Sequence, residues 1–580
     1  MADAPETYDI AIIGGGISGL YTAWRLASQT DGPPLRVCLH EWSDRLGGRM
    51  DTRQVPTRST RVELGAMRFP PSQQMISSLL NELQVATEPF PAQDFLHMYL
   101  RGKPLSFSPS PAGPPTVNDL PYRLAGTESS HPFVLLTQAL LRILPPPMML
   151  GQTGFEKPGA NGKGTPISAA EWDQILGQVT VDGKPLWQWG FWNLLNRVMS
   201  NEAYQYLLDA FGVESAVSNW NALLAMRLLC TIMGDAIAND LRHPVGGWIE
   251  LVNALEAKLQ ALPNCTVVKN SMLLNAVQIN PQDNASAFQL TFWVNKFTEM
   301  VIPTGPKTNF TVDLPSVAEV VASNLVLALP PRGIELLNLG FLNNDQLRAF
   351  IQLTQQVMRI PAFKAYVSYE EPWWRQWCGF DSGYTVTDLP LRQVFYGIGF
   401  SGPKQQSADD QLMNQRILMT SYADARTVDF WSGLLPPGQR VSEFWGAAQN
   451  QKLPIRQAMN REMKELHGYE FDFPDGEWAC TVDWTADPFG AGWHAWRPNV
   501  DVLTEIPKMR RPLSDWLPEL KLFLCGEAFS HIQGWIEGAI TSAEMLLEEQ
   551  FKLKRPSWIP ADYPLGPAMP APKSTSNTGA

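Results

Sequence analysis

The sequence predicts an α/β fold that opens with a Rossmann-like, doubly wound unit, and three observations in the first forty residues predict it. The apolar run 8–13 has the length and composition of a buried parallel strand. Apolar residues then recur at helical spacing over 17–27. A second strand is expected over 35–40, and it ends at Glu41. Strand, turn, helix and strand in this order are typical of a βαβ unit.

The turn between the first strand and the first helix has the sequence GGGISG at 14–19. The first glycine permits a tight turn, the second lets the backbone approach a pyrophosphate, and the third lets helix and strand pack closely. The helix N-terminus favours the phosphate charge, and a carboxylate at the end of the second strand can accept hydrogen bonds from ribose hydroxyls. A plain glycine turn is the alternative. The dinucleotide contacts predicted here are Gly14, Gly16, Ile17, Ser18, Gly19 and Glu41.

A second glycine motif, RLGGR at 45–49, follows directly. Paired glycines allow close backbone approach, and the flanking arginines offer guanidinium donors for phosphate. Gly48 and Arg49 are therefore expected to contact the cofactor, although a basic turn without a ligand would look the same in isolation.

The rest of the chain divides into helical and strand-like stretches. Two Pro/Gly-rich stretches, 101–122 and 144–166, are expected to be excursions rather than parts of a continuous sheet. Helical patterns at 133–143, 169–176 and 187–233 predict a mainly helical subdomain. Strands are predicted at 266–269, in a meander up to 329, and at 362–369, 394–400 and 522–525, with helices at 248–259 and 537–551. The tail from 552 is Pro-rich, then Ser/Thr-rich, and is expected to be extended or flexible.

Composition and charge exclude several classes of function. The net charge of −12 argues against binding nucleic acid. The chain has no run of about twenty apolar residues that could span a membrane, and no basic segment precedes its first apolar run. We therefore expect a soluble, cytoplasmic protein without a signal peptide. The six cysteines are scattered with no C-x-x-C pair, so no metal site is predicted. The 21 tryptophans hint at a large apolar pocket, although core packing accounts for most of them.

Taken together, five motifs resemble the flavin amine oxidase superfamily, and most closely its L-amino acid oxidase branch. They are GGGISG at 14–19, RLGGR at 45–49, ELGAMRFP at 63–70, HPVGGW at 243–248 and CGEAFSHIQGWIEGAITSAE at 525–544. The resemblance implies an FAD-binding domain built from separate segments, an α+β substrate-binding domain and a helical domain. The expected boundaries are 1–75, 241–330 and 481–552 for FAD binding, 76–114 and 331–480 for substrate binding, 115–240 for the helical domain, and 553–580 for the tail.

The resemblance also implies how FAD is held. Monoamine oxidases carry a cysteine that links the flavin in a stretch comparable to 484–493, which has none here, so noncovalent FAD is expected. Glu527 is expected to reach the ribityl–pyrophosphate region. The further cofactor contacts implied are Gly65, Ala66, Met67, Arg68, Val268, Gly526, Glu527, Gly534, Trp535 and Ile536.

Arg68 lies among Ala, Met, Phe and Pro, where an arginine is buried only if an anion pairs with it. The planar guanidinium suits a carboxylate, and an internal Asp or Glu is the alternative partner. In amino acid oxidases the matching arginine binds the substrate α-carboxylate. Amine and polyamine oxidases act on substrates without this carboxylate, so Arg68 indicates amino acids.

Lys364, Tyr396 and Trp535 are also expected to be catalytic, and Gly534 to bind substrate. Lys364 alternates with Ala362 and Tyr366 on an apolar strand, so its side chain is expected to be enclosed and its pKa lowered. The resemblance implies that Lys364 holds a water molecule near flavin N5. The alternative is a lysine at a strand end whose side chain extends to solvent. Tyr396 is expected to bind the carboxylate with Arg68, with a core tyrosine as the alternative. Gly534 and Trp535 are expected to border the substrate amino group, with ordinary packing as the alternative for Trp535.

The function implied is FAD-dependent oxidative deamination of L-amino acids to 2-oxo acids, with release of ammonia and hydrogen peroxide. The α-hydrogen leaves as hydride to flavin N5, and dioxygen reoxidises the flavin. The expected partners are an L-amino acid and dioxygen, with a homodimer as the oligomer. Three alternatives stay open: an amide-forming L-amino acid 2-monooxygenase, an amine or polyamine oxidase, and a flavin-dependent structural or toxin-like binding protein.

Overall fold

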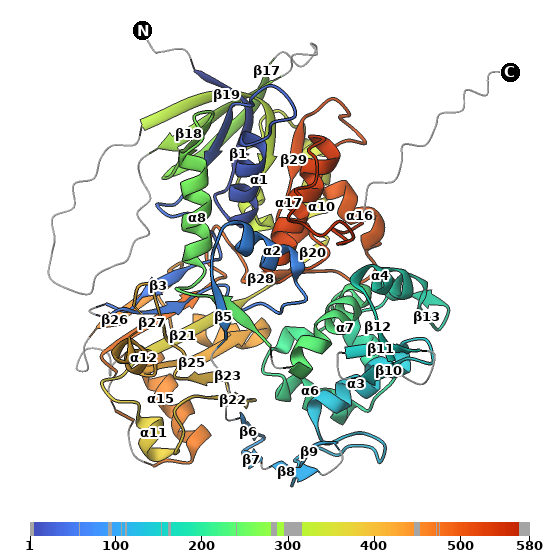
Figure 1. Cartoon of the computed structure of the whole chain (residues 1–580), viewed down its shortest axis with the longest axis vertical. Helices are drawn as coiled ribbons and strands as arrows, with labels where there is room; N and C mark the ends of the chain where they lie inside the picture. Colours follow the sequence, from blue (N-terminus) through green and yellow to red (C-terminus); the bar gives the residue numbers. More distant parts are fainter. Residues whose placement is uncertain are drawn as a thin grey trace.

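Two large β-sheets organise the chain, with a mainly helical region beside the second (Figure 1). The computed structural model describes residues 5–56, 58–90, 96–105, 107–110, 113–151, 154–159, 164–238, 240–279, 287–294, 316–405, 407–445, 453–470, 473–474 and 476–567.

The first sheet has the strand order β16-β2-β1-β19-β18-β17, with β29 also pairing β19. Its strands are β1 (Glu6–Ile13), β2 (Val37–His40), β16 (Cys265–Val268), β17 (Ser271–Ile279), β18 (Ala287–Val294), β19 (Ser316–Leu327) and β29 (Leu522–Leu524). β16, β2, β1, β19 and β29 are mutually parallel, while β17 and β18 form an antiparallel meander. Ile13, Leu327 and Leu524 lie at one level in the register, so three parallel strands end together. Such carboxyl ends are where ligands bind in open α/β sheets.

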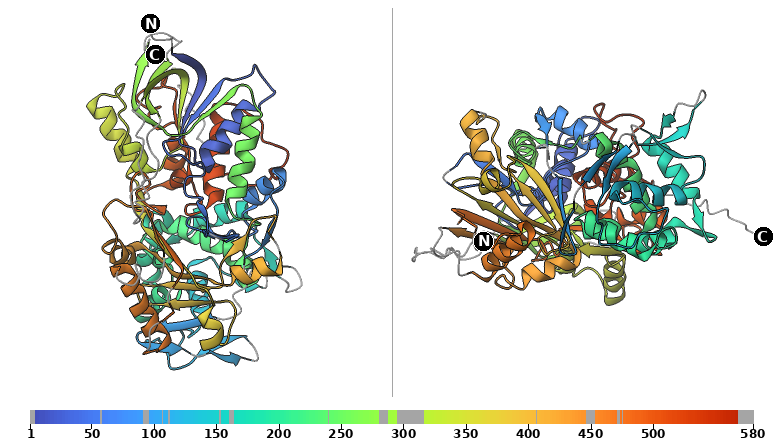
Figure 2. Two further views of the ribbon diagram at one scale, coloured as in Figure 1. Left: turned by 90° about the vertical axis from the view of Figure 1, so that its left-hand side faces the viewer. Right: turned by 90° about the horizontal axis from the view of Figure 1, so that it is seen from below.

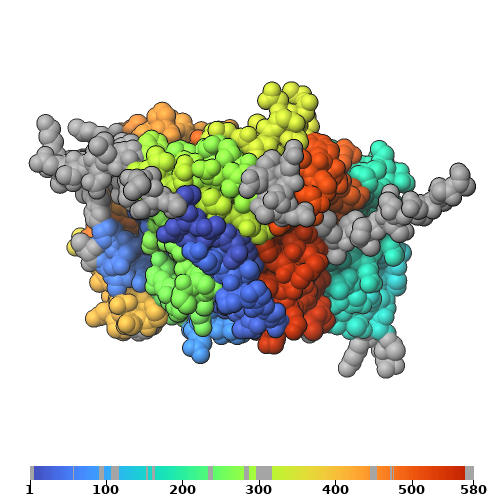
Figure 3. Space-filling view, turned by 90° about the horizontal axis from the view of Figure 1, so that it is seen from above, coloured from blue at the N-terminus to red at the C-terminus, as the bar shows by residue number. Residues whose placement is uncertain are grey.

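Three helices cover one face of this sheet: α1 (Ile17–Ala27), α8 (Ile249–Gln260) and α17 (Ile536–Gln550). α1 lies between the other two (Figure 2). Along β1, Ile10 and Ile12 face these helices, whereas Ala11 and Ile13 face the core on the other side. Both faces are thus covered, which explains the continuous apolar run. Seen from above, the N-terminal part of the chain (blue) lies between the green part, which contains α8, and the red part, which contains α17 (Figure 3).

The second large sheet is mixed and has the order β26-β27-β21-β25-β23-β22-β6-β7. Its strands are β6 (Leu96–Leu100), β7 (Lys103–Leu105), β21 (Ala362–Ser368), β22 (Gly383–Thr387), β23 (Gln393–Tyr396), β25 (Ile417–Asp424), β26 (Val441–Trp445) and β27 (Trp478–Asp483). β22 and β6 are parallel, and the other neighbours are antiparallel. The helices that follow or interrupt this part of the chain are α9 (Pro331–Glu335), α10 (Asn344–Thr354), α11 (Trp373–Trp377), α12 (Ala408–Asn414), η4 (Ala425–Thr427), α13 (Val428–Ser432) and α15 (Pro454–His467).

The region between residues 132 and 238 is mainly helical and carries two small sheets of its own, β10-β11-β12 and β13-β14. Its helices are α3 (Pro132–Ile143), α4 (Ala169–Gln178), η2 (Leu186–Gln188), α5 (Phe191–Leu195), α6 (Asn201–Ala210), η3 (Glu214–Val217) and α7 (Ala222–Ala238). The strands β10 (Met149–Gly151), β11 (Gly154–Pro158), β12 (Gly164–Pro166), β13 (Thr180–Val181) and β14 (Lys184–Pro185) pair only among themselves. The prediction that 144–166 joins no continuous sheet is thus confirmed. The same prediction for 101–122 is wrong at Lys103–Leu105, which turns back from β6 to form the edge strand β7 of the second large sheet.

Short elements connect these regions. They are β3 (Thr52–Gln54), β4 (Thr60–Glu63), α2 (Gln74–Glu82), β5 (Thr87–Pro89), β8 (Phe107–Ser110), β9 (Gly113–Val117), β15 (Arg242–Pro244), β20 (Val357–Ile360), β24 (Phe400–Ser401), β28 (Trp493–Trp496), α16 (Val502–Met509) and η5 (Glu527–Phe529). β20 pairs with β28, and β24 pairs with β4.

The predicted α/β fold class is confirmed, including a Rossmann-like sheet assembled from separate segments and a second, mixed sheet. One predicted strand, 394–400, is wrong in its extent. Gly397 has a φ of +67°, which ends β23 at Tyr396, and Phe400 belongs to a different sheet.

Residues 553–567 of the tail, which is expected to be extended or flexible, have no regular secondary structure but pack against the core. Prolines leave this segment without regular secondary structure, yet Ile559, Tyr563 and Leu565 are buried in the core beside α1 and α17. Apolar side chains hold it in place of a hydrogen-bonded ladder. Residues 568–580 lie outside the described part of the chain. Among the described residues, no helix is long and apolar enough to cross a membrane.

Candidate active site

The two glycine motifs meet at the end of β1. The Gly47 N–H donates to Gly15 O at 2.9 Å, and Gly16 and Gly47 form an isolated bridge. A Cβ on Gly19 would lie 1.9 Å from Gly14 O, so helix α1 could not approach the turn with any larger residue. A Cβ on Gly16, in contrast, would meet no atom within 4 Å. The second glycine therefore borders open space, as a backbone that receives a phosphate must.

The N-terminus of α1 points into this space. Gly16 is its N-cap, and no side chain caps the first turn, which contains Ile17 and Ser18. Gly526, at the end of β29, has a φ of +143°, and the atom nearest to its virtual Cβ is Ser18 Oγ at 3.9 Å. Gly48 faces the turn as well, since its virtual Cβ would lie 3.2 Å from Gly16 Cα. Backbone N–H groups without partners at a helix N-terminus favour an anion.

Glu41 lies beside the glycine turn, as predicted. It is 7% exposed, and its Oε2 accepts from the Gly15 N–H at 2.7 Å. Ser43 donates from its backbone at 3.0 Å and from its hydroxyl at 2.7 Å to Oε1. Burial raises the pKa of Glu41, and these hydrogen bonds oppose the rise. Val268 is adjacent, because its carbonyl accepts from the Glu41 N–H at 2.9 Å.

Arg49 and Glu527 form a buried ion pair between the second glycine motif and η5. Arg49 Nη2 lies 2.8 Å from Glu527 Oε2, and the His494 Nδ1 lies 2.9 Å from the same oxygen. The backbone N–H groups of His494 and Gly534 donate to Glu527 Oε1 at 3.0 and 2.7 Å. Burial alone raises the pKa of Glu527, but the charges of Arg49 and His494 lower it to about 2. Glu527 is the carboxylate expected to reach the cofactor, and its negative charge is thus balanced by Arg49 within the protein.

The segment from Glu63 to Arg68 links the two halves of the site. The Ala66 N–H donates to Arg49 O at 3.0 Å, and a Cβ on Gly65 would lie 1.8 Å from that oxygen. Trp484 Nε1 donates to Leu64 O at 3.0 Å, so the stretch 484–493 packs on this segment. Only glycine at 65 permits this close approach.

Arg68 is half-buried between two aromatic rings. Its Cζ lies 5.3 Å from the centroid of Phe90 and 5.6 Å from that of Phe395, distances suited to cation–π attraction. Within the described part of the chain, no Asp or Glu forms an ion pair with Arg68, so the predicted alternative of an internal ion pair has no support there. Burial lowers the pKa of Arg68, and Tyr384 and Tyr422 oppose this shift.

Tyr384 and Tyr422 are the tyrosines beside Arg68, and sequence reasoning missed both. They lie on β22 and β25, and burial raises the pKa of each to about 12 while the Arg68 charge lowers it. The Tyr384 hydroxyl donates to Gln393 Oε1 at 3.1 Å. The signal that could have found Tyr422 is the apolar and β-branched run 417–423, which reads as a strand.

Tyr396 is not part of this group, and the prediction that it clamps a carboxylate with Arg68 is wrong. Because successive side chains of a strand face opposite ways, Phe395 faces Arg68 and Tyr396 faces the other side of the sheet. There the Tyr396 hydroxyl lies 2.8 Å from His467 Nε2, and Trp373 packs edge-on against its ring. It is the core tyrosine of the alternative interpretation.

Lys364 lies on β21 with its ammonium enclosed, as the alternation with Tyr366 predicts. It is 3% exposed, and Nζ donates to Gly65 O at 2.6 Å and to Glu63 O at 3.2 Å. Met67 Sδ is 3.8 Å away. Burial lowers the pKa of Lys364, the Glu63 charge opposes this shift and the Arg68 charge adds to it. Burial therefore favours the neutral amine of Lys364, whose nitrogen lies against the Gly65 carbonyl.

Gly534 and Trp535 stand immediately before α17. Gly534 is exposed and has a φ of +83°, and its virtual Cβ would lie 2.9 Å from the Trp493 ring. Trp535 is the N-cap of α17, with no side-chain hydrogen bond to the first turn; Ile536 begins the helix. Trp493 in turn meets Trp220 edge-on, at 6.3 Å between ring centroids. Tryptophans thus run from the α17 N-terminus to the helical region.

The glycine turn, the bridged second motif and the helix N-terminus together fit a dinucleotide. The open space over Gly16 is large enough to admit a phosphate oxygen close to the backbone, and the Glu41 carboxylate lies at the adjacent strand end. His494 Nε2 is fully buried and has no hydrogen-bond partner in the described structure, so a polar group is missing beside it.

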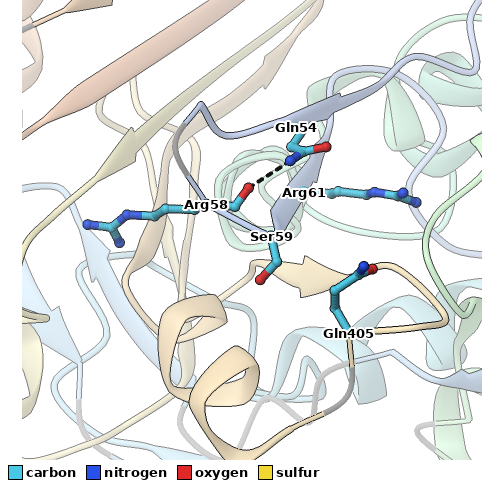
Figure 4. A pocket seen from close by; sticks show the side chains of 5 residues that line it. All are labelled: Gln54, Arg58, Ser59, Arg61 and Gln405. Carbon is cyan, nitrogen blue, oxygen red and sulfur yellow. Dashed lines mark hydrogen bonds between the residues drawn. The ribbon is translucent and has the colours of Figure 1, made fainter.

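A separate hollow of about 410 Å³ lies between the β3–β4 hairpin and the loop containing Gln405 (Figure 4). Its two arginines already have partners. Arg58 pairs with Glu477, and Arg61 Nη1 lies 2.7 Å from Glu250 Oε1. The side chain of Arg58 also points away from the other lining residues. This hollow therefore does not compete with the Arg68 region as a site for an anionic substrate.

Comparisons with known proteins agree with this geometry. Residues 17–277 and 305–545 match the family of flavin containing amine oxidoreductases. The chain is 25% identical to aplysianin-A of Aplysia kurodai over 94% of its own length and 91% of that protein, and 22% identical to achacin of Lissachatina fulica over 94% of its own length and 93% of that protein. It is 23% identical to an L-amino-acid oxidase of Mus musculus, over 92% of this chain and 69% of that protein. A putrescine oxidase double mutant has the same fold, with a TM-score of 0.56, 16% identity, and coverage of 95% of this chain and 100% of that one.

Proposed function

We propose that this chain, which belongs to the family of flavin-containing amine oxidoreductases, oxidises L-α-amino acids to 2-oxo acids with FAD and dioxygen. Membership of the family implies a flavin cofactor, an amine substrate and dioxygen. The proposal adds the α-carboxylate, the L configuration and noncovalent FAD. Ammonia and hydrogen peroxide are the other products.

The observation that carries the proposal is the environment of Arg68. A guanidinium held between Phe90 and Phe395 has lost much of its hydration, and no carboxylate of the described chain replaces that hydration. Such a cation is costly in the protein alone and strongly favours an incoming anion. A carboxylate is the anion that matches the planar fork in two hydrogen bonds.

Tyr384 and Tyr422 take the place that Tyr396 was expected to fill. Their hydroxyls are protonated over the physiological range, because burial raises both pKa values to about 12. The Tyr422 hydroxyl can donate to a carboxylate bound by Arg68, and the Tyr384 hydroxyl can do so once it turns away from Gln393 Oε1. The register supports this arrangement, since Gln393 pairs with Tyr422 and its side chain accepts from Tyr384.

A flavin held by the glycine turns would supply the two-electron acceptor for the α-hydrogen and its electron pair, with dioxygen as the final acceptor. The chain's own residues orient the substrate and control protons. Lys364 is the enclosed group that can hold or release a proton near the expected position of the flavin, because burial lowers its pKa. Arg68 and the two tyrosines fix one end of the substrate, and Gly534 and Trp535 border the other. Orientation of this kind accounts for much of the rate of such a reaction.

The L configuration and the use of an amino acid draw support from one relative. The mouse protein named L-amino-acid oxidase aligns with 92% of this chain. The putrescine oxidase supports the fold only, at 16% identity.

Anaerobic mixing of the holoenzyme with a panel of L- and D-amino acids, followed by flavin absorbance, tests the proposal. Bleaching by L-amino acids, little by their D forms, and one peroxide and one ammonia per dioxygen in aerobic turnover are expected. An amide product without free peroxide would instead assign a 2-monooxygenase. Bleaching by amines alone would assign an amine oxidase, and no bleaching by either class would leave a flavin-binding protein without this activity.

A further inference from the structure

The C-terminal strap, residues 552–567, lies outside the family match, which ends at residue 545. It is nevertheless tied to the protein along its length. Arg25 Nη2 donates to Lys554 O at 2.8 Å, and Arg555 forms two hydrogen bonds with Glu548, at 2.8 and 3.2 Å. At its far end Arg510 Nη2 donates to Pro567 O at 2.9 Å.

Tyr563 is the residue of the strap that contacts the N-terminal end of α17, the end beside the candidate active site. The ring is 6% exposed, and its hydroxyl donates to the carboxylate of Glu537. Arg555 Nη1 holds the Tyr563 carbonyl at 3.1 Å, and Gly566 packs against the His531 ring, where a Cβ would lie 2.6 Å from Nδ1. The Tyr563 hydroxyl is therefore positioned by backbone that is itself held in place, rather than by a mobile tail.

Glu537 joins three pieces of the molecule. It is the second residue of α17 and is fully buried. Its carboxylate accepts from the N–H groups of Met75 at 3.0 Å and Ile76 at 2.7 Å, which belong to the first turn of α2. A carboxylate on one helix thus caps the N-terminus of another, satisfying two of its free donors. Tyr563 supplies the third donor.

Trp535 stands two residues before Glu537, as the N-cap of α17, and its own side chain makes no capping hydrogen bond to that first turn. The position of Trp535 therefore depends on how firmly Glu537 is held. Burial raises the pKa of Glu537 to about 7, and the Tyr563 hydroxyl, the two α2 donors and the Arg227 charge oppose the rise. Loss of the hydroxyl would leave a buried oxygen with one donor fewer, which favours rearrangement of this turn.

We propose that Tyr563 is a positioning residue: by donating to Glu537, the C-terminal strap fixes the first turn of α17 and thereby holds Trp535 against the amino-group end of the substrate. The inference rests on the proposed function for the placement of that end. It assigns a role to a segment that the sequence suggests is flexible.

The chain provides a matched control on the same helix. The Tyr21 hydroxyl donates to Glu544 Oε2 at 2.6 Å, and Tyr21 is fully buried. Glu544 lies seven residues beyond Glu537, about two helical turns further from Trp535. Tyr563→Phe and Tyr21→Phe each remove one hydrogen bond from a tyrosine hydroxyl to a glutamate of α17. The first bond lies beside Trp535 and the second lies distant from it.

The test compares the two variants as holoenzymes with two ligands. For Tyr563→Phe, the rate of flavin bleaching at saturating L-phenylalanine is expected to fall about tenfold, the effect of one hydrogen bond to a charged group. The Kd of 3-phenylpropanoate, which has the carboxylate but no amino group, should stay within about twofold, because Arg68 and its tyrosines are untouched. Tyr21→Phe should change neither quantity by more than about twofold.

Three outcomes would overturn the inference: no change in Tyr563→Phe, an equal loss of rate in both variants, or a parallel loss of 3-phenylpropanoate binding. The proposed function fails separately, in the wild-type arm, if L-phenylalanine does not bleach the flavin and 2-phenylethylamine does. The two variants are then compared with that amine, since the wall beside the amino group serves either substrate.

Discussion

Two arginines sit at the two ends of the site, and the protein treats their charges differently. Arg49 lies against Glu527 at 2.8 Å, with His494 hydrogen-bonded to the same carboxylate. Arg68 lies between Phe90 and Phe395, and no described carboxylate pairs with it. A paired charge stabilises the fold around it, whereas a buried unpaired charge reduces stability and favours a ligand. The charge of Arg49 is therefore balanced within the protein, whereas the charge of Arg68 is left to be balanced by the proposed substrate.

The largest effect is expected at the unpaired arginine. Arg68→Met should lower kcat/KM for L-amino acids about 1,000-fold, because two charge-assisted hydrogen bonds to a carboxylate are worth roughly 4 kcal/mol together. The free energy of unfolding of the apoprotein should stay equal or rise, since an unpaired charge is removed. Steady-state kinetics and urea unfolding of the same preparations measure both. Arg49→Met is the control, and it should lower stability. Similar destabilisation by the two variants would remove the distinction between the arginines.

The paired carboxylate gives the next effect. Glu527 has a pKa lowered from 4.5 to about 2. A depressed carboxyl pKa adds stability that is present above the unfolded-state value and is lost as the pH falls through the folded-state value. Glu527→Gln should therefore reduce the free energy of unfolding by about 3 kcal/mol at pH 7. The difference from wild type should shrink between pH 4.5 and 2, the two limits of that shift. Chemical denaturation across this range measures it, and a difference independent of pH would contradict the assignment to the Glu527 charge.

The open space over Gly16 can be probed without disturbing the apoprotein. Gly16→Ala adds a Cβ that meets no protein atom within 4 Å, so the stability of the apoprotein should not change. FAD affinity should fall about 100-fold, because the methyl occupies the place of a phosphate. Gly19→Ala is the contrasting control: its Cβ would lie 1.9 Å from Gly14 O, and the apoprotein itself should be destabilised. Equilibrium titration with FAD is the measurement, and undiminished affinity in Gly16→Ala would place the phosphate elsewhere.

The smallest effect distinguishes the tyrosines on the two faces of the second sheet. Tyr422→Phe should lower kcat/KM for L-amino acids about tenfold, the effect of one hydrogen bond to a carboxylate. Tyr396→Phe should change it by less than about twofold, because its hydroxyl contacts His467 in a separate core. The reverse order would restore Tyr396 to the substrate site.

The backbone geometry of the glycine turns could be predicted because these motifs are backbone requirements. A φ of +143° at Gly526, or a Cβ 1.9 Å from Gly14 O at position 19, leaves glycine as the residue that fits, so the sequence records the geometry directly. Glu41 could be placed because a parallel strand ends at a known edge of the sheet.

The substrate end was harder to predict because it depends on which face of a strand each side chain occupies. Phe395 faces Arg68, whereas the next residue, Tyr396, faces the other side of the sheet. A register shift of one residue would move every side chain of the strand to the opposite face. β25 carries register shifts against both of its neighbours, so alternation alone could not place Tyr422. The strap was missed for another reason: its anchors, such as Tyr563 to Glu537, join residues that no local pattern connects.

The claim that Arg68 awaits an α-carboxylate is tested most directly by one ratio. Anaerobic flavin bleaching is measured with L-phenylalanine and with 2-phenylethylamine, which differ in the carboxylate, for the wild type and for Arg68→Met. The account predicts that the wild type prefers the amino acid by about 1,000-fold in second-order rate constant, and that Arg68→Met brings the ratio close to one. A wild-type ratio near one, or an equal preference in both proteins, would contradict it.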